Sequence, residues 1–317
     1  MKIGTRGSAL ALWQARTVAR LIQGCGGPEC EMVVIRTSGD ERSGPPDAPD
    51  TLGTPAAPGT LNIKTLFVKE IEEALLERRI DLAVHSSKDL PGVLPDGLEL
   101  AAALEREDPS DALLLPLTSN IRGFAGVKQA LGGHPRIGTS SVRREAQLRA
   151  VFPDATFVAI RGNVDTRLRK LDSGDCDVLV LAAAGVKRLE LDARISALLP
   201  VEVCVPAPGQ GTVAVEIRRD AAVTVRDLVT RISDADAATA LVAERAVVLA
   251  LGGGCQMPLG VLATLDGQQL DIRGVVTSLD GRIVVRASVR GNRGGAAAAG
   301  EKLAAHLLAK GAGDVLK

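Results

Sequence analysis

The stretch "IDLAVHSSKDLPG", residues 80–92, shows the pattern that sets the fold: a short apolar run is followed at once by polar side chains. Earlier apolar runs at residues 2–5 and 31–37 alternate with helical patterns in the same way. Strands that alternate with helices need crossover connections, which produce a mainly parallel sheet. We therefore predict an α/β fold in which residues 85–89 lie beyond the carboxyl end of a strand, where ligands of such sheets bind.

The alternation of apolar runs and helical patterns starts again near residue 105 and predicts a second α/β lobe. Its strands are expected at "DALLL", "PRIGTSS", "TFVAI" and "DVLVLAAAG", with helices over 142–151 and 164–172. A further strand, "GTVAVEIR" (211–218), is interpreted as returning to the first lobe. Lobe 1 is thus predicted to comprise residues 1–104 and 203–221, and lobe 2 residues 105–202.

The sequence changes character after residue 222 and predicts a small C-terminal α+β domain, residues 222–317. Tight-turn signals in "LDGQQL" and "LDGR" indicate an antiparallel sheet with helices on one face. The elements expected are strands near 260–265, 268–277 and 282–289, and helices over 235–250 and 297–310.

Composition excludes several classes of protein. Lys+Arg and Asp+Glu balance at 38 each, and aromatics make up 2% of the 317 residues with no tyrosine, so nucleic acid is not an expected partner. No apolar run is long enough to span a membrane, and the amino terminus lacks a signal-peptide core, which predicts a soluble cytosolic protein. No P-loop or dinucleotide fingerprint follows a strand, so a nucleotide cofactor is not expected.

Cysteine and histidine usage predicts neither a disulfide framework nor a metal site. The five cysteines include no C-x-x-C pair, and none of the three histidines has ligand spacing to a cysteine or a carboxylate cluster. One cysteine, Cys255 in "GGGCQMPLG" (252–260), sits in a glycine-rich loop where a ligand could reach its thiol. The alternative, an inert small residue in a turn, is favoured by this stretch alone.

Positive charge is concentrated between residues 136 and 170, where eight Lys/Arg accompany three Asp/Glu. Arg143, Arg144 and Arg161 follow strand ends, and arginine forks match carboxylates bidentately, so a ligand with several carboxylates is predicted. The alternative is a solvated basic helix face, which is our interpretation of Arg169 and Lys170.

Small hydroxyl residues follow two strand ends as well. Ser8, near Arg6, and one residue of 139–141 are placed to cap a helix while its free N–H groups face an anion. Asp89, at the end of the opening stretch, is either a ligand-facing carboxylate or a turn residue that binds backbone N–H groups before Pro91. The segment 41–60, dense in Pro and Gly, is expected to form a mobile loop.

Seven motifs together resemble the hydroxymethylbilane synthase family, also called porphobilinogen deaminase. They are, in order, "TRGSALALWQ", "AVHSSKDLP", "GTSSVRREAQL", "RGNVDTRL", "AAGVKRL", "PAPGQGTVAVE" and "GGGCQMPLG". The resemblance implies an enzyme of tetrapyrrole (haem) biosynthesis that joins four porphobilinogen molecules head to tail, releases ammonia at each step and hydrolyses off the linear product. It also implies two lobes like those of periplasmic binding proteins, a third domain, and a monomer.

The resemblance also implies roles for individual residues. Cys255 carries a dipyrromethane cofactor through a thioether, and Asp89 is the catalytic carboxylate. The arginines that bind pyrrole carboxylates are Arg6, Arg143, Arg144, Arg161, Arg167 and Arg188. The remaining contacts to the cofactor are Ser8, Phe67, Ser86, Lys88, Thr139, Ser140, Ser141 and Gln210, the last expected to be exposed at a crossing between lobes.

The chain departs from the family pattern before Phe67. The family usually reads P-L-A-x-x-G-G-K-G-L-F there, whereas this chain has "GTLNIKTLFVKE", in which Lys64 stands for one loop lysine and Thr60 falls near the other.

A rival hypothesis is a two-lobed anion-binding receptor or sensor without catalysis. It explains the arginines but neither Cys255 nor Asp89.

Overall fold

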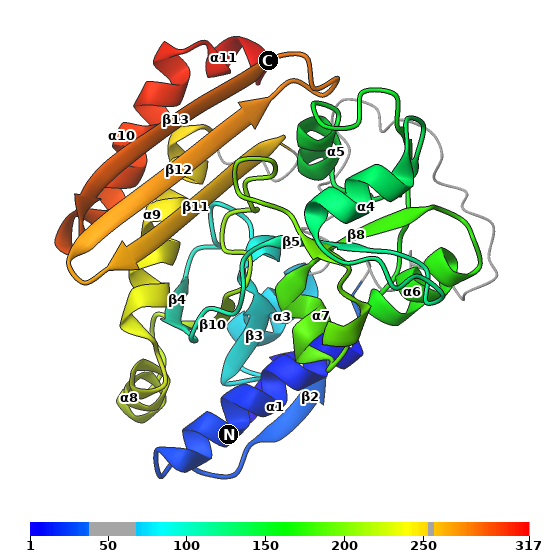
Figure 1. Cartoon of the computed structure of the whole chain (residues 1–317). Coiled ribbons are helices and arrows are strands. Elements are labelled where there is room, and N and C mark those ends of the chain that lie inside the picture. Colours follow the sequence, from blue (N-terminus) through cyan, green and yellow to red (C-terminus); the bar gives the residue numbers. More distant parts are fainter. Residues whose placement is uncertain (38–67, 253–256, 317) are drawn as a thin grey trace. The chain divides into compact units, whose positions relative to one another are not determined.

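The computed structural model describes residues 1–37, 68–252 and 257–316 (Figure 1). These form two compact units. The first comprises Met1–His85, Asp89–Ala102 and Ala214–Ile232, and the second Ser86–Lys88, Ala103–Val213 and Ser233–Lys317. The predicted loop 41–60, Thr60, Lys64, Phe67 and Cys255 lie outside the described residues.

The first unit is built on a five-stranded sheet with the order β2-β1-β3-β10-β4. Its strands are β1 (Lys2–Thr5), β2 (Glu31–Val34), β3 (Leu82–Ser86), β4 (Leu98–Ala103) and β10 (Val213–Arg218). β1 runs parallel to both β2 and β3, as the crossover pattern predicts. β10 lies between β3 and β4, which confirms that the strand predicted at 211–218 returns to the first sheet.

Within the described residues, three helices accompany this sheet: α1 (Ala9–Gly24), α3 (Lys69–Leu76) and α8 (Val223–Arg231). α3 turns Ile71 and Leu75 inward, where they pack on Ile80 and Leu98. Each of these side chains is at most 1% exposed, so this apolar cluster stabilises the sheet by burial. α8 belongs to this unit, and Arg226 on α8 pairs with Glu99 of β4. The three-domain boundaries given above stay a prediction.

The second unit contains a five-stranded sheet with the order β7-β6-β8-β5-β9. Its strands are β5 (Asp111–Leu114), β6 (Arg136–Gly138), β7 (Thr156–Val158), β8 (Val178–Ala182) and β9 (Ala197–Leu198). β6 is parallel to β7 and β8, but β5 is antiparallel to β8 and β9, so this sheet is mixed. Helical crossovers join β6 to β7 and β7 to β8, and these three strands run parallel.

The helices around this mixed sheet are α4 (Phe124–Leu131), α5 (Val142–Leu148), α6 (Val164–Asp172) and α7 (Ala183–Arg188). Capping side chains set two of the starts: Ser141 accepts from the backbone N–H of Arg144, and Asn163 accepts from that of Thr166. The apolar interior lies on both faces of the strands, which explains why β8 reads as an uninterrupted apolar run.

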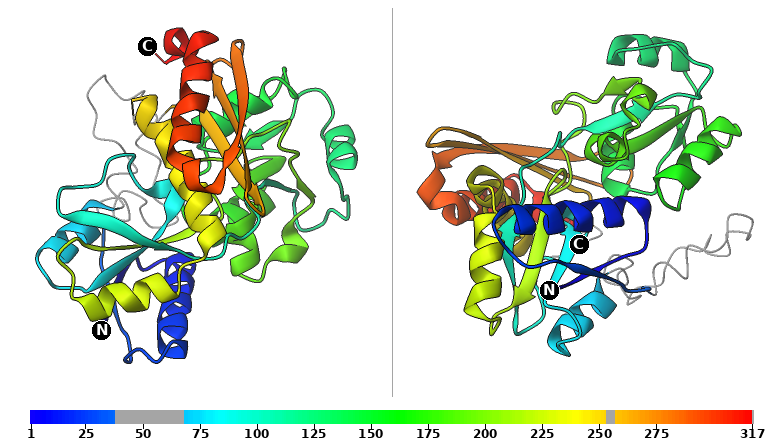
Figure 2. Two further views of the ribbon diagram at one scale, coloured as in Figure 1. Left: turned by 90° about the vertical axis from the view of Figure 1, so that its left-hand side faces the viewer. Right: turned by 90° about the horizontal axis from the view of Figure 1, so that it is seen from below.

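The C-terminal part has a three-stranded antiparallel sheet in the order β11-β12-β13, as predicted. The strands are β11 (Leu259–Asp266), β12 (Gln269–Thr277) and β13 (Val284–Asn292), followed by α10 (Ala296–Ala309) and the short α11 (Ala312–Val315). Together with α9 (Ala235–Ala250), α10 covers one face of the sheet (Figure 2). The prediction of an antiparallel sheet with helices on one face is confirmed.

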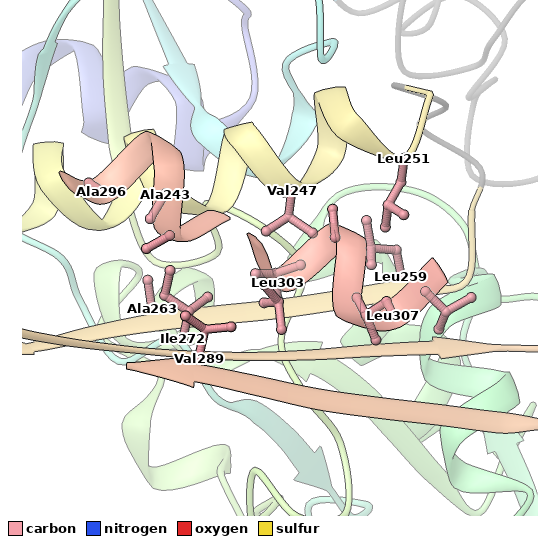
Figure 3. Close-up of a cluster of buried hydrophobic side chains, with 14 of the residues drawn as sticks. Ala243, Val247, Leu251, Leu259, Ala263, Ile272, Val289, Ala296, Leu303 and Leu307 are labelled. Carbon is pink, nitrogen blue, oxygen red and sulfur yellow. The ribbon is translucent and has the colours of Figure 1, made fainter. Parts of the chain in front are cut away.

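The interior of this C-terminal part lies between the two helices and the sheet, where Val247, Leu303 and Leu307 meet Ile272 (Figure 3). The two helices cross closely at Gly300 of α10. A Cβ on that residue would lie 2.3 Å from the carbonyl oxygen of Ala243, so any larger side chain would push α10 away from α9.

Within the described residues, none of the helices is long and apolar enough to cross a membrane.

A buried acidic cluster lies in the first unit. His85 of β3 and Glu216 of β10 share a hydrogen bond of 3.0 Å between Nε2 and Oε2, and both side chains are at most 4% exposed. Glu72 of α3 is 5% exposed, and its Oε1 has no hydrogen-bond partner among the described residues. Burial, followed by the negative charge of Glu216, raises the pKa of Glu72 to about 8.

This raised pKa makes the stability of the protein depend on pH. The native state keeps a proton on Glu72 that the unfolded chain releases above its ordinary pKa of 4.5, so wild-type stability falls as pH rises from there to about 8. Glu72→Gln, which cannot ionise, should remove a slope of up to about 1.4 kcal/mol per pH unit. Denaturant melts of both proteins at pH 5 to 8 measure the difference. The control is Glu73→Gln, an exposed neighbour on α3; a parallel pH dependence of wild type and Glu72→Gln would contradict the shift.

Candidate active site

Asp89 stands at the end of β3, as the opening stretch predicts. It closes the short 3-10 turn Ser87–Asp89 and is half-buried. No hydrogen bond or ion pair joins its carboxylate to another residue that the structure describes, so the alternative of a turn residue binding backbone N–H groups is not supported. The hydrogen bond between His85 and Glu216 lies near the same end of β3. Asp89 therefore presents a half-buried carboxylate without such a contact in the part of the chain that the structure describes.

Ser86 and Lys88 flank Ser87, whose backbone is held by the segment at 209–212. The Ser87 N–H donates to the carbonyl oxygen of Thr212 at 3.0 Å. Gly209 has a φ of +72°, and a Cβ there would lie 2.4 Å from Ser87 Oγ, so this approach requires glycine. The side chains of Ser86 and Lys88, both half-buried, thus extend from a backbone whose position is fixed.

Arg6 and Ser8 follow β1 at the start of α1. Ser8 Oγ accepts a hydrogen bond of 3.3 Å from the backbone N–H of Ala11, which makes it the helix cap expected from the sequence. Arg6, two residues earlier, is half-buried. The strand end and the cap together set where the Arg6 side chain begins.

The hydroxyl groups of 139–141 organise the start of α5. Thr139 Oγ1 accepts from the Ser141 N–H at 3.2 Å, and Ser140 Oγ donates to the carbonyl oxygen of Ile160 at 3.0 Å. Of the three candidates for the cap, Ser141 is the one observed. These hydrogen bonds hold the turn after β6. The helix α5 that follows brings its first turn to Asp111, the first residue of β5.

Arg143 and Arg144 are both buried and both contact Asp111 of β5. Arg143 donates from Nη1 to Oδ2 at 2.7 Å and from Nη2 to Oδ1 at 3.1 Å, while Arg144 donates from Nε to Oδ1 at 2.9 Å. Arg143 Nη1 also reaches the carbonyl oxygen of Val205, and Arg144 Nη1 that of Val180, at 2.7 and 3.0 Å. These contacts offset the unfavourable position of two cations in the first turn of a helix.

Of the other predicted arginines of this unit, Arg161 follows β7, Arg167 lies within α6 and Arg188 ends α7. Arg161, half-buried after β7, makes no hydrogen bond or ion pair with another described residue. Arg167 Nε donates to the carbonyl oxygen of Gly162 at 2.7 Å, and Arg188 Nη2 donates to that of Gly211 at 2.7 Å. Burial lowers the pKa of Arg188, and the nearby Glu107 acts in the opposite direction.

The expectation that Gln210 is exposed is wrong. Its side chain is buried at 1% exposure because its amide donates to the carbonyl oxygen of Pro109 at 2.7 Å and to Asp111 Oδ1 at 2.9 Å. Two acceptors around Nε2 fix the orientation of the amide. In this structure Gln210 therefore serves as a hydrogen-bond donor to Asp111.

Sequence reasoning missed Asp111 itself. It begins the apolar run "DALLL" and reads as an ordinary turn residue before a strand. Its partners come from residues 143, 144, 204 and 210, which no local pattern connects to it. The one available signal was the pair of arginines in a first helical turn, because their position requires a counter-charge from elsewhere.

The four described cysteines are free thiols, and two of them are buried. Burial raises the pKa of Cys204 to about 12 and that of Cys176 to about 11, so neither forms the reactive thiolate at neutral pH. Among the residues that the structure describes, no group of three or more His, Cys, Asp or Glu side chains could hold a metal ion.

The solved structures that partly resemble this chain include the immunogenic lipoprotein A from Vibrio vulnificus, with a TM-score of 0.41 and 14% identity over 75% of this chain and 97% of that chain. The periplasmic VFT2 domain of BvgS from Bordetella pertussis has a TM-score of 0.40 and 14% identity over 73% of this chain and 86% of that chain.

Sequence relatives cover the whole length. The porphobilinogen deaminase of Syntrophomonas wolfei subsp. wolfei is 45% identical over 100% of this chain and 97% of its own length. That of Syntrophotalea carbinolica is 45% identical over 100% and 95%, and that of Pelotomaculum thermopropionicum is 43% identical over 99% and 95%.

Two family models match in sequence order. Residues 1–226 match the porphobilinogen deaminase, dipyromethane cofactor binding domain, and residues 238–309 match the porphobilinogen deaminase, C-terminal domain. The two matches span most of the chain, and they agree with the full-length relatives. The chain belongs to the porphobilinogen deaminase family.

Proposed function

We propose that this chain is a hydroxymethylbilane synthase, a transferase that condenses four porphobilinogen molecules head to tail with loss of ammonia. The growing polypyrrole extends from a bound dipyrromethane primer. Hydrolysis then releases it as the linear tetrapyrrole hydroxymethylbilane. The observation that carries the proposal is the 45% identity to a porphobilinogen deaminase over the full length, together with the two family models in order. A cytoplasmic monomer is part of the proposal and rests on the family resemblance.

The residues present fit a dipyrromethane. Its pyrroles bear acetate and propionate groups, so a protein that holds it needs cationic donors. Arg161 has a guanidinium without a partner among the described residues, and Arg143 and Arg144 share a single carboxylate, that of Asp111. Arginine forks bind carboxylates through two parallel hydrogen bonds. We assign these three, with Arg6, Arg167 and Arg188, to the carboxylates of the cofactor and the growing chain.

The hydroxyl and amine groups near the strand ends complete the binding set. Ser8, Ser86 and Lys88 stand beside Arg6 and Asp89 in the sequence, and Thr139, Ser140 and Ser141 form the turn before Arg143. We include Phe67 on the resemblance alone, since it lies outside the described residues, and we include Gln210 through its hydrogen bond to Asp111.

Asp89 performs the acid–base work. Its carboxylate holds the aminomethyl ammonium of porphobilinogen, stabilises the cation left when ammonia departs, and accepts the proton lost from the ring that is attacked. The absence of a partner for this carboxylate among the described residues leaves it able to do so. Stabilisation of developing charge by a fixed group is commonly the largest contribution to catalysis.

Cys255 is the attachment point in this proposal, through a thioether from its sulfur to the cofactor. When bound, the dipyrromethane supplies the pyrrole ring to which the first porphobilinogen is joined. The buried Cys204 and Cys176, with pKa values of about 12 and 11, are poor candidates for the same task.

Intact-protein mass spectrometry tests the proposal most directly. The purified protein should exceed its sequence mass by two deaminated pyrrole units, and it should consume porphobilinogen with release of ammonia. A receptor with the same fold would have its bare sequence mass and leave porphobilinogen unchanged, and that result would refute the proposal.

A further inference from the structure

The carboxylate of Asp111 is completely buried at the head of β5. A lone carboxylate in such a position is strongly disfavoured unless several donors surround it. Here the surrounding donors come from three separate stretches of the second unit: α5, the segment at 204 and the segment at 210. Burial alone would raise the pKa of Asp111, but the charges of Arg143 and Arg144 outweigh it and hold this pKa well below its usual range.

Every acceptor position of this carboxylate is occupied. Oδ1 receives Arg144 Nε at 2.9 Å and Gln210 Nε2 at 2.9 Å, in addition to Arg143 Nη2 at 3.1 Å. Oδ2 receives Arg143 Nη1 at 2.7 Å and the Cys204 thiol at 3.2 Å. A carboxylate has about four lone-pair positions. The orientation of the Asp111 carboxylate is therefore fixed, and so are the positions of the two guanidinium groups that donate to it.

The cluster is not electrically balanced. Two guanidinium groups face one carboxylate, and the Cys204 thiol is neutral because its pKa is about 12. One positive charge remains, on side chains that are 5% and 7% exposed. A buried excess charge is unfavourable until an anion neutralises it. A carboxylate bound beside the two guanidinium groups would neutralise this charge.

We propose that Asp111 is a positioning residue for the ligand-binding arginines: it holds Arg143 and Arg144 in place and leaves them one uncompensated positive charge for a pyrrole carboxylate. This inference rests on the proposed function, because the pyrrole carboxylate comes from the cofactor or the growing chain. Asp111 touches neither; it acts through the two arginines.

The test compares Asp111→Asn with wild type and with Asp177→Asn. Asp177 also pairs with an arginine, Arg136, in the same unit, but both side chains are substantially exposed, so that pair is a matched control away from the cluster. Adduct mass, KM for porphobilinogen and kcat are measured well below the melting temperature of each variant. We expect Asp111→Asn to retain less cofactor and to raise KM at least tenfold, with a smaller change in kcat, and Asp177→Asn to match wild type.

Asp111→Asn with a lowered melting temperature but the KM and adduct of wild type would show a purely structural role and overturn the proposal. If this variant does not fold, Cys204→Ala replaces it, since that change removes one hydrogen bond to Oδ2 and keeps all three charges. A severalfold rise in KM is then expected, and an unchanged KM refutes the proposal. Wild-type protein without adduct or turnover would instead refute the proposed function.

Discussion

Asp89→Asn lowers kcat by about 10²–10⁴-fold, in our expectation, while the protein keeps its fold. The substitution is nearly isosteric, and no hydrogen bond to another described residue is lost with the charge. A neutral amide can neither hold the substrate ammonium electrostatically nor accept a proton from the attacked ring. Stopped assays of porphobilinogen consumption, with the melting temperature measured alongside, provide the comparison.

Asp96→Asn serves as the control for this experiment. Asp96 is exposed, lies in the same compact unit and precedes β4, so its loss should leave both turnover and stability unchanged. Near-normal turnover by Asp89→Asn would remove Asp89 from its assigned role, even if the family assignment stands.

Cys255→Ser should yield protein without the stable adduct. A serine oxygen is a much weaker nucleophile than a thiolate at neutral pH, so the thioether cannot be replaced by an equivalent bond. Intact-protein mass spectrometry should then give the bare sequence mass, and porphobilinogen consumption should fall to background because the primer is missing.

Cys30→Ser is the matched control, since Cys30 is a free, half-buried thiol in the first unit. Its adduct mass should equal that of wild type. An adduct that persists in Cys255→Ser would place the attachment on another residue and would make each remaining cysteine a candidate in turn.

The helices and strands with strong local signals were predictable from sequence. α6 and α9 have the predicted bounds because Asn163 and Asp234 cap their starts, and the C-terminal hairpins follow from their turn residues. β4 was not predicted, because its "LELAAA" lacks the β-branched residues typical of strands. The antiparallel pairing of β5 was also missed, since strand direction depends on connections between sheets and leaves no trace in local periodicity.

The residues of the candidate site were likewise predictable only in part. Asp89, Ser8 and the turn at 139–141 follow strand ends, so their positions could be predicted from the order of elements. Asp111 and the burial of Gln210 could not, because their hydrogen bond joins residues 99 positions apart. Long-range pairing of this kind is decided by packing, which a single sequence does not display.

The place of β10 inside the first sheet has a consequence for the nascent chain. Because β10 separates β3 from β4, the sheet cannot close before residue 218 has been synthesised, whereas all strands of the mixed sheet lie between residues 111 and 198. During translation the later sheet can therefore become ordered while the edge of β3 still lacks its neighbour. An unpaired strand edge is prone to association with other chains, so the first sheet is open to such association for longer during synthesis than the mixed sheet.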